Sequence, residues 1–151
     1  MKPKPRKLYI EMVPESAWNN NLRAIFNRAQ WDKLRKQVYA AYDHKCAVCK
    51  SDRKLAAHEI WAYDDAKHTQ TLAGIVALCS MCHHVKHIGL AQHLASEDRL
   101  NFGAIIGHYC RINKCTRKEF EQDLADAESQ WAERSKHNWE LILGEKDGNT
   151  P

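Results

Sequence analysis

Four of the six cysteines stand in two Cys-x-x-Cys pairs, Cys46 with Cys49 and Cys79 with Cys82. Four thiols in two such pairs are typical of a tetrahedral zinc site, in which each pair holds the metal from one side. A structural Zn²⁺ is therefore predicted here, tying together segments that are distant in sequence. Unmetallated redox thiols are the alternative, and the matched second pair argues against them.

Three histidines lie close to these cysteines and are not needed by the structural site. His83 and His87 are spaced i, i+4 in a predicted helix, so their imidazoles share one face and can share one metal. A metal held by two histidines with open positions would be catalytic in type. His58 could then take a proton from a water aimed at a phosphodiester, because the ordinary pKa of imidazole is near neutrality.

A strand–strand–helix unit is predicted to position these residues. Residues 55–63 are rich in apolar and β-favouring types and form a predicted strand that carries His58. Residues 72–78 form a second, antiparallel strand, with Gly74 as a candidate bulge. Residues 80–88 are predicted to be a short helix.

The region before this unit is predicted to contain a strand and a helix. Residues 8–13 alternate weakly, which indicates a short strand. Apolar residues at helical spacing over residues 22–42 indicate a helix that leads into the first cysteine pair. The basic side chains on its other face, Lys33, Arg35 and Lys36, could lie along nucleic-acid phosphates, with a solvated face as the alternative.

The region after the unit is predicted to be mainly helical. Ser96 is a candidate N-cap for a helix that continues through Tyr109. Thr116 and Glu119 form a capping box that opens another helix. Residues 138–143 alternate and could form a last strand that pairs with residues 8–13.

Composition and charge favour a single domain that meets a polyanion. The chain has 151 residues, 44% of them hydrophobic, which is enough for one core. Residues 1–60 carry 13 Lys and Arg against 6 Asp and Glu, whereas residues 116–151 carry 5 against 9. A basic N-terminal half suits nucleic acid, and a solvated surface with a charged tail is the alternative.

The chain has no apolar run near the roughly 18 residues of a membrane span and no signal peptide. A cytoplasmic location without a membrane partner is therefore expected, and thiols stay reduced there. The remaining cysteines, Cys110 and Cys115, are expected to be buried free thiols.

Taken together, Cys-x-x-Cys, a strand with His-Glu-Ile, and a return strand ending in Leu-Cys-x-x-Cys-His resemble the HNH endonuclease family of the ββα-metal type. The resemblance covers residues 46–88. It implies an α+β fold in which a zinc-braced ββα-metal core is embedded in a mostly helical domain. It also implies that His58 is the general base and His83 a metal ligand, and the His-x-x-x-His version of colicin-type nucleases adds His87. Mg²⁺, Mn²⁺, Ni²⁺ or Zn²⁺ serves in different members and helps to hydrolyse DNA.

Two positions depart from the family pattern. Ala57 stands where many members have an Asp or His ligand before the base, and Gly74 stands where the motif has Asn. Glu59, Asp64, Asp65 or water could supply the third ligand of the catalytic metal. The departures favour an alternative, a non-catalytic zinc-containing module that binds nucleic acid. A zinc-stabilised protein-interaction domain is a third reading and would leave the basic half unused.

The predicted organisation is a disordered basic arm at residues 1–7, one HNH-like domain at 8–144 and a disordered tail at 145–151. Within the domain, the ββα-metal core spans 46–88 and a helical extension spans 89–137. Double-stranded DNA is the expected partner. A lone site of this type cuts one strand at a time, so double-strand cleavage would need a homodimer or successive nicks.

Overall fold

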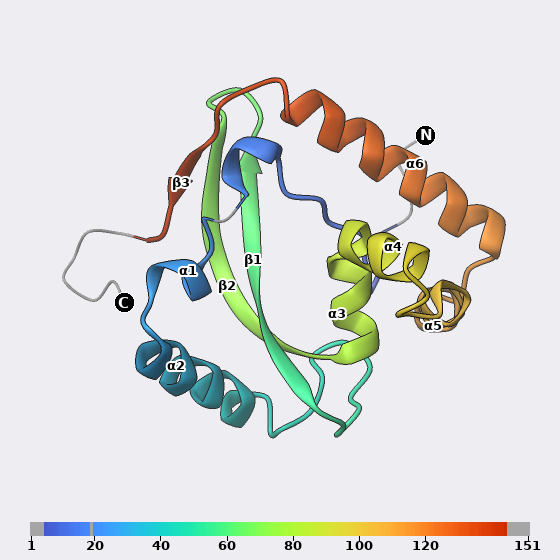
Figure 1. Cartoon of the computed structure of the whole chain (residues 1–151), viewed down its shortest axis with the longest axis horizontal. Helices are drawn as coiled ribbons and strands as arrows, with labels where there is room; N and C mark the ends of the chain where they lie inside the picture. Colours follow the sequence, from blue (N-terminus) through green and yellow to red (C-terminus); the bar gives the residue numbers. More distant parts are fainter. Residues whose placement is uncertain (1–4, 19, 145–151) are drawn as a thin grey trace.

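A long antiparallel hairpin forms the centre of the protein (Figure 1). Its strands are β1 (Leu55–Asp64) and β2 (Thr69–Cys79), and α3 (Ser80–Lys86) follows directly. The structure is a computed structural model that describes residues 5–18 and 20–144. The predicted α+β class is confirmed, as is the order of strand, strand and helix in this unit.

Helices lie on both sides of the hairpin, with α1 and α2 on one side and α3 to α6 on the other (Figure 1). The remaining helical elements are η1 (Glu15–Ala17), α1 (Leu22–Ile25), α2 (Arg28–Ala41), α4 (Ile88–Ser96), α5 (Phe102–Asn113) and α6 (Arg117–Arg134).

Each face of the hairpin packs against a different hydrophobic core. His58 and Ala57 are neighbours on β1, so their side chains point to opposite faces. Ala57 packs with Ala77 of β2 and Val38 of α2 in a small cluster. The larger core lies on the other face and draws buried residues from β2, α3, α5 and α6: Leu78, Val85, Ile105, Tyr109 and Phe120.

The ladder between the two strands shifts register between Ile60 and Trp61, opposite the segment that contains Gly74. An irregularity of this kind increases local strand twist. The bulge predicted at Gly74 lies one residue away, because Gly74 pairs with Ile60 and Ala73 is the residue without a partner in the ladder.

The predicted strand at residues 8–13 is wrong. These residues are extended but join no ladder, and side chains bind the backbone at the two ends of the segment. The Asn113 side chain accepts from Leu8 N–H at 2.9 Å and donates to Leu8 O at 2.7 Å. The Trp131 indole donates to Val13 O at 3.0 Å.

The predicted last strand exists, but its predicted partner is wrong. β3 (Glu140–Ile142) pairs in parallel with β2, where Thr69 lies opposite Glu140. The sheet therefore has the order β1-β2-β3, and β1 is left at its edge.

The single helix predicted over residues 22–42 is divided in two. Asn27 accepts from the Gln30 N–H at 2.8 Å, and the Gln30 side chain accepts from the Asn27 N–H at 3.0 Å. With this capping box a new helix, α2, begins after Asn27. The helical spacing of apolar residues is therefore interrupted there.

The helix boundaries after the hairpin also differ from the prediction. α3 ends at Lys86, and α4 starts at Ile88 and was not predicted. Ser96 ends α4 rather than capping α5, whose cap is Asn101. The capping box at Thr116 is confirmed at the start of α6.

The predicted disordered segments lie mostly outside the described residues, at 1–4 and 145–151. Within the predicted arm, Arg6 is held in place by ion pairs to Asp123 at 2.9 Å and Glu119 at 3.3 Å. In the part of the chain that the structure describes, no helix combines the length and apolar character needed to cross a membrane.

Candidate metal centres

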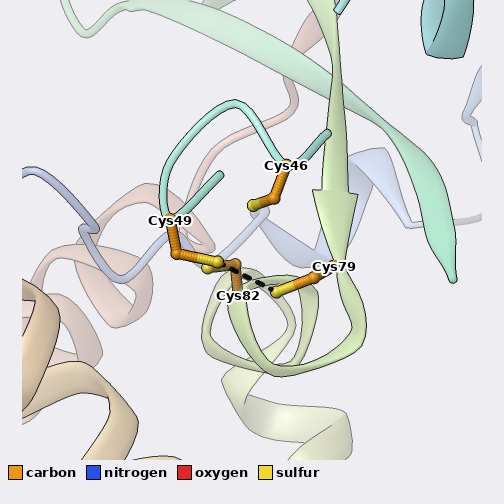
Figure 2. A group of neighbouring side chains, drawn as sticks. All are labelled: Cys46, Cys49, Cys79 and Cys82. Atoms are coloured by element: carbon orange, nitrogen blue, oxygen red, sulfur yellow. Dashed lines mark hydrogen bonds between the residues drawn. The ribbon is translucent and has the colours of Figure 1, made fainter. Parts of the chain in front are cut away.

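The four cysteines of the two pairs converge at the base of the hairpin (Figure 2). Their sulfur atoms all lie within 4.8 Å of one another, and Cys46 and Cys82 are fully buried. The Cys49 and Cys79 sulfurs are 3.5 Å apart. Tetrahedral Zn–S bonds of about 2.3 Å would place neighbouring sulfurs about 3.8 Å apart. The predicted quartet is brought together and could hold a metal ion such as zinc.

Short-range structure sets both pairs in position. The first pair lies on a turn closed by hydrogen bonds from Lys50 N–H to Cys46 O and from Cys46 N–H to Ser51 O, at 3.0 and 2.8 Å. The second pair spans the junction of β2 and α3, where Cys79 is the N-cap of the helix. The hydrogen bond between Cys46 and Cys82 lowers the pKa of Cys46 and raises the pKa of Cys82. The thiolate, which is the form that binds metals, is therefore favoured at Cys46.

His108 of α5 is a partner of the cysteine group that the sequence did not reveal. Its Nε2 lies 3.2 Å from the Cys82 sulfur, and its Nδ1 lies 3.2 Å from Arg111 Nη2. A guanidinium can only donate, so Nδ1 accepts and the proton of neutral His108 is on Nε2. Burial lowers the pKa of His108, which favours this neutral form. Nε2–H therefore donates to the Cys82 sulfur, a hydrogen bond that would stabilise the Cys82 thiolate when a metal is bound.

Replacing His108 with alanine is expected to weaken metal binding by the cysteine group about tenfold to a hundredfold, as is usual for partners of metal ligands. The reason is that the Cys82 thiolate would lose its buried donor. Competition with a colourimetric zinc chelator measures the effect. His93→Ala, at an exposed position on α4, is the matched control. Equal zinc affinity in His108→Ala and wild type would contradict the assigned hydrogen bond.

The three predicted histidines form a second group on the His58 face of the hairpin. One ring nitrogen from each of His58, His83 and His87 lies within 4.8 Å of the others, so the group could hold a metal ion. The ring centroids are 5.3 Å apart for His58–His83, 4.9 Å for His58–His87 and 4.6 Å for His83–His87. Burial, with the neighbouring His87 and His58, lowers the pKa of His83 to about 3. His83 is therefore neutral near pH 7, the form that binds metals.

None of the three acidic residues considered as the third ligand joins this group. Glu59 is buried and accepts from Leu22 N–H at 3.1 Å, at the start of α1. Asp64 accepts from two backbone N–H groups of the hairpin turn, and Asp65 pairs with Arg134 at 2.8 Å. The third residue of the group is His58.

Glu11 is the acidic residue that does lie beside the histidines. Its Oε2 is 3.7 Å from His58 Nε2, and the two side chains are only 8% and 5% exposed. Neither Glu11 oxygen has a hydrogen-bond partner among the described residues, nor does either ring nitrogen of His58. The sequence distinguishes Glu11 only as a single acidic residue within the otherwise apolar run at residues 8–13.

Lys86 is a second buried charged residue next to the histidines that the sequence did not reveal. Its Nζ lies 2.8 Å from the centroid of the Tyr9 ring and has no hydrogen-bond partner among the described residues. Burial lowers the pKa of Lys86 to about 8, and the nearby Glu11 carboxylate opposes this shift.

A pocket of about 510 Å³ adjoins the histidine group, and His58, His87 and Glu11 contribute to its lining. Much of the remaining lining is apolar, including Trp18 and Trp131, whose rings stack with centroids 6.2 Å apart. Trp18 is 54% exposed. The pocket therefore offers a flat aromatic surface next to a group that could hold a metal ion.

The basic residues predicted to contact nucleic acid do not lie at the histidine group. Lys33, Arg35 and Lys36 are on α2, which packs on the face of the hairpin opposite His58. Arg35 also donates to Asp32 at 2.9 Å on the same helix. A role for these three side chains in binding nucleic acid stays a prediction.

The chain was compared with protein-family models, with curated proteins and with solved structures, and nothing in any of the three sets matches it. The geometry of the two groups is therefore the basis for a functional proposal.

Proposed function

We propose that this protein is a metal-dependent endonuclease that hydrolyses DNA phosphodiester bonds, with an active site of the HNH type. The observation that carries the proposal is the convergence of His58, His83 and His87 on a hairpin–helix unit. The four-cysteine group at the base of the same unit supports it as a structural zinc site. The two groups would then have the separate roles, structural and catalytic, that the resemblance implies.

The donor set of the histidine group fits a divalent metal. His83 and His87 would hold the metal with coordination positions left open, as in a catalytic site, and His58 beside them would act as the general base. A metal held there would supply Lewis acidity that stabilises charge developing on a phosphodiester. These two histidines would hold that metal, while the neighbouring pocket would receive the part of the nucleic acid next to the cut bond.

Charge and pocket chemistry support nucleic acid as the substrate. The basic N-terminal half of the chain suits a polyanion. The exposed Trp18 in the pocket wall could stack on a base, because aromatic side chains bind unpaired bases in this way without regard to sequence.

A plasmid-relaxation assay tests the proposal. Purified protein should convert supercoiled plasmid to open-circle or linear forms when Mn²⁺, Ni²⁺, Zn²⁺ or Mg²⁺ is added, and EDTA should stop the reaction. Folded protein that cuts with none of these metals would overturn the endonuclease proposal. Salt-sensitive DNA binding without cutting would instead favour the non-catalytic binding module.

Replacing Trp18 with alanine is expected to raise KM for a single-stranded oligonucleotide about tenfold, because base stacking on an aromatic ring contributes about 1–3 kcal/mol. kcat should change little, since Trp18 is not in the histidine group. Trp18→Phe keeps an aromatic surface and should stay near wild type. An unchanged KM in Trp18→Ala would show that substrate does not use this wall of the pocket.

A further inference from the structure

We infer that His58 is the third metal ligand of the histidine group, and that the buried Glu11 carboxylate completes this site by orienting His58 and neutralising charge on the cation. The inference rests on the proposed metal site but not on nuclease activity. It changes the role predicted for His58, from general base to ligand, and it adds a residue outside the hairpin–helix unit.

The three imidazoles are arranged almost symmetrically, which favours equal roles. Their ring centroids are separated by 4.6 to 5.3 Å, and their planes are inclined by 75° to 81°. Three imidazoles on one tetrahedral metal, with bonds of about 2.0–2.1 Å, would have centroids about 5 Å apart. A general base would instead lie farther from the two ligands, because a water molecule has to fit between the base and the metal. The His58 ring is 5.3 Å from His83 and 4.9 Å from His87, and these two distances are close to the 4.6 Å between His83 and His87.

Burial of Glu11 gives the second, independent observation. An ionised carboxylate is costly to bury without a partner. Glu11 is 8% exposed, and the contact at 3.7 Å from Oε2 to His58 Nε2 is too long for a hydrogen bond. A cation on His58 would draw the carboxylate and the imidazole together, because metal-bound histidines usually donate their second N–H to a carboxylate.

This assignment accounts for both ring nitrogens of His58 and for one of the two Glu11 oxygens, all of which lack hydrogen-bond partners among the described residues. One nitrogen of His58 would bind the metal and the other would donate to Glu11. Lys86, whose ammonium is also buried nearby, lies over the Tyr9 ring and does not form an ion pair with Glu11 within 4.0 Å among the described residues. The buried Tyr63 hydroxyl is a further polar group close to Glu11, and burial together with the Glu11 charge raises the pKa of Tyr63.

The donor set also selects the class of metal. Imidazole nitrogens suit Zn²⁺, Ni²⁺ and similar transition metals, whereas Mg²⁺ requires oxygen ligands and keeps several waters. A site with three imidazoles should therefore bind Ni²⁺ or Zn²⁺ and discriminate against Mg²⁺.

Calorimetric titration of the purified protein, with the metal of its cysteine group retained, tests the inference. Wild type should bind one equivalent of Ni²⁺, and Mg²⁺ at the same concentrations should not bind. Glu11→Gln should weaken Ni²⁺ binding about tenfold to a hundredfold, and His58→Ala should weaken it at least as much. Glu15→Gln, an exposed change in the same segment, should bind as wild type.

Three outcomes would overturn the inference: wild-type Ni²⁺ affinity in Glu11→Gln, wild-type affinity in His58→Ala, or Mg²⁺ binding as tight as Ni²⁺ binding. Circular dichroism checks that each variant is folded. If Glu11→Gln does not fold, Glu11→Asp keeps the charge on a shorter side chain and should also bind Ni²⁺ more weakly than wild type, whereas unchanged affinity would count against the role of Glu11.

The plasmid assay separates this inference from the proposed function. Ni²⁺ binding that depends on Glu11 and His58, without any cutting, would retain the metal site and reject the endonuclease. Metal-dependent cutting that Glu11→Gln leaves intact, together with unchanged Ni²⁺ affinity, would retain the endonuclease and reject the inference.

Discussion

Replacing Cys82 with serine is expected to unfold most of the protein, because it removes a ligand from the site that ties the turn at residues 46–51 to the junction of β2 and α3. Structural zinc contributes about 10–16 kcal/mol in small metal-dependent folds, which is comparable to the whole stability of an ordinary domain, about 5–15 kcal/mol. Cys82 is 0% exposed, so the serine hydroxyl would also be buried. Strong chelation of wild type should have a similar effect.

Thermal unfolding followed by circular dichroism, with bound zinc quantified in parallel, measures this result. Cys110→Ser provides the matched control, because Cys110 is free, half-buried and outside the four-cysteine group. That variant should retain one equivalent of zinc and most of its stability. A cooperative transition near the wild-type temperature in metal-free Cys82→Ser would mean that the cysteine group does not stabilise the fold.

Replacing His58 with alanine is expected to lower the rate of plasmid cutting by at least a hundredfold, whichever role His58 has. Loss of a general base typically costs 10²–10⁴ in rate, and loss of a metal ligand would remove the catalytic metal as well. Initial rates under saturating Mn²⁺ or Ni²⁺ provide the measurement.

The matched control for this variant is His93→Ala, since His93 is exposed on α4 and is not part of the histidine group. Its rate should equal that of wild type. A His58→Ala protein that is folded and cuts at the wild-type rate would locate the active site elsewhere, even if the protein is an endonuclease.

The histidine and cysteine groups could be foreseen because their ligands are concentrated in a short stretch. Spacing within the chain places His83 and His87 on one helical face, and the hairpin between the cysteine pairs returns His58 to them. Local patterns of this kind depend on backbone periodicity, which the sequence expresses directly.

Glu11 and His108 could not be foreseen, because each reaches its group through tertiary packing alone. Glu11 is 47 positions before His58, and His108 is 26 positions after Cys82. The incorrect strand at residues 8–13 has the same origin, since the side chain that satisfies Leu8 belongs to Asn113. Periodicity carries no information about partners so distant in sequence.

The hydrogen bonds of residues 8–16 affect the order in which the protein can fold during synthesis. Its hydrogen bonds run almost entirely to the far end of the chain: Leu8 to Asn113, Val13 to Trp131, Ser16 to Trp139. During synthesis this segment leaves the ribosome before these partners, which lie 105 or more residues later in the chain. The hairpin and its metal ligands can form earlier, but residues 8–16 have to wait for α5 and α6 before they can settle.

The proposed metal site would therefore be incomplete on nascent chains, since Glu11 belongs to the segment that docks late. Activity would begin only after residues up to Trp139 had emerged. The order of translation would in this way delay the proposed DNA-cutting activity until residues 8–16 have docked against these partners.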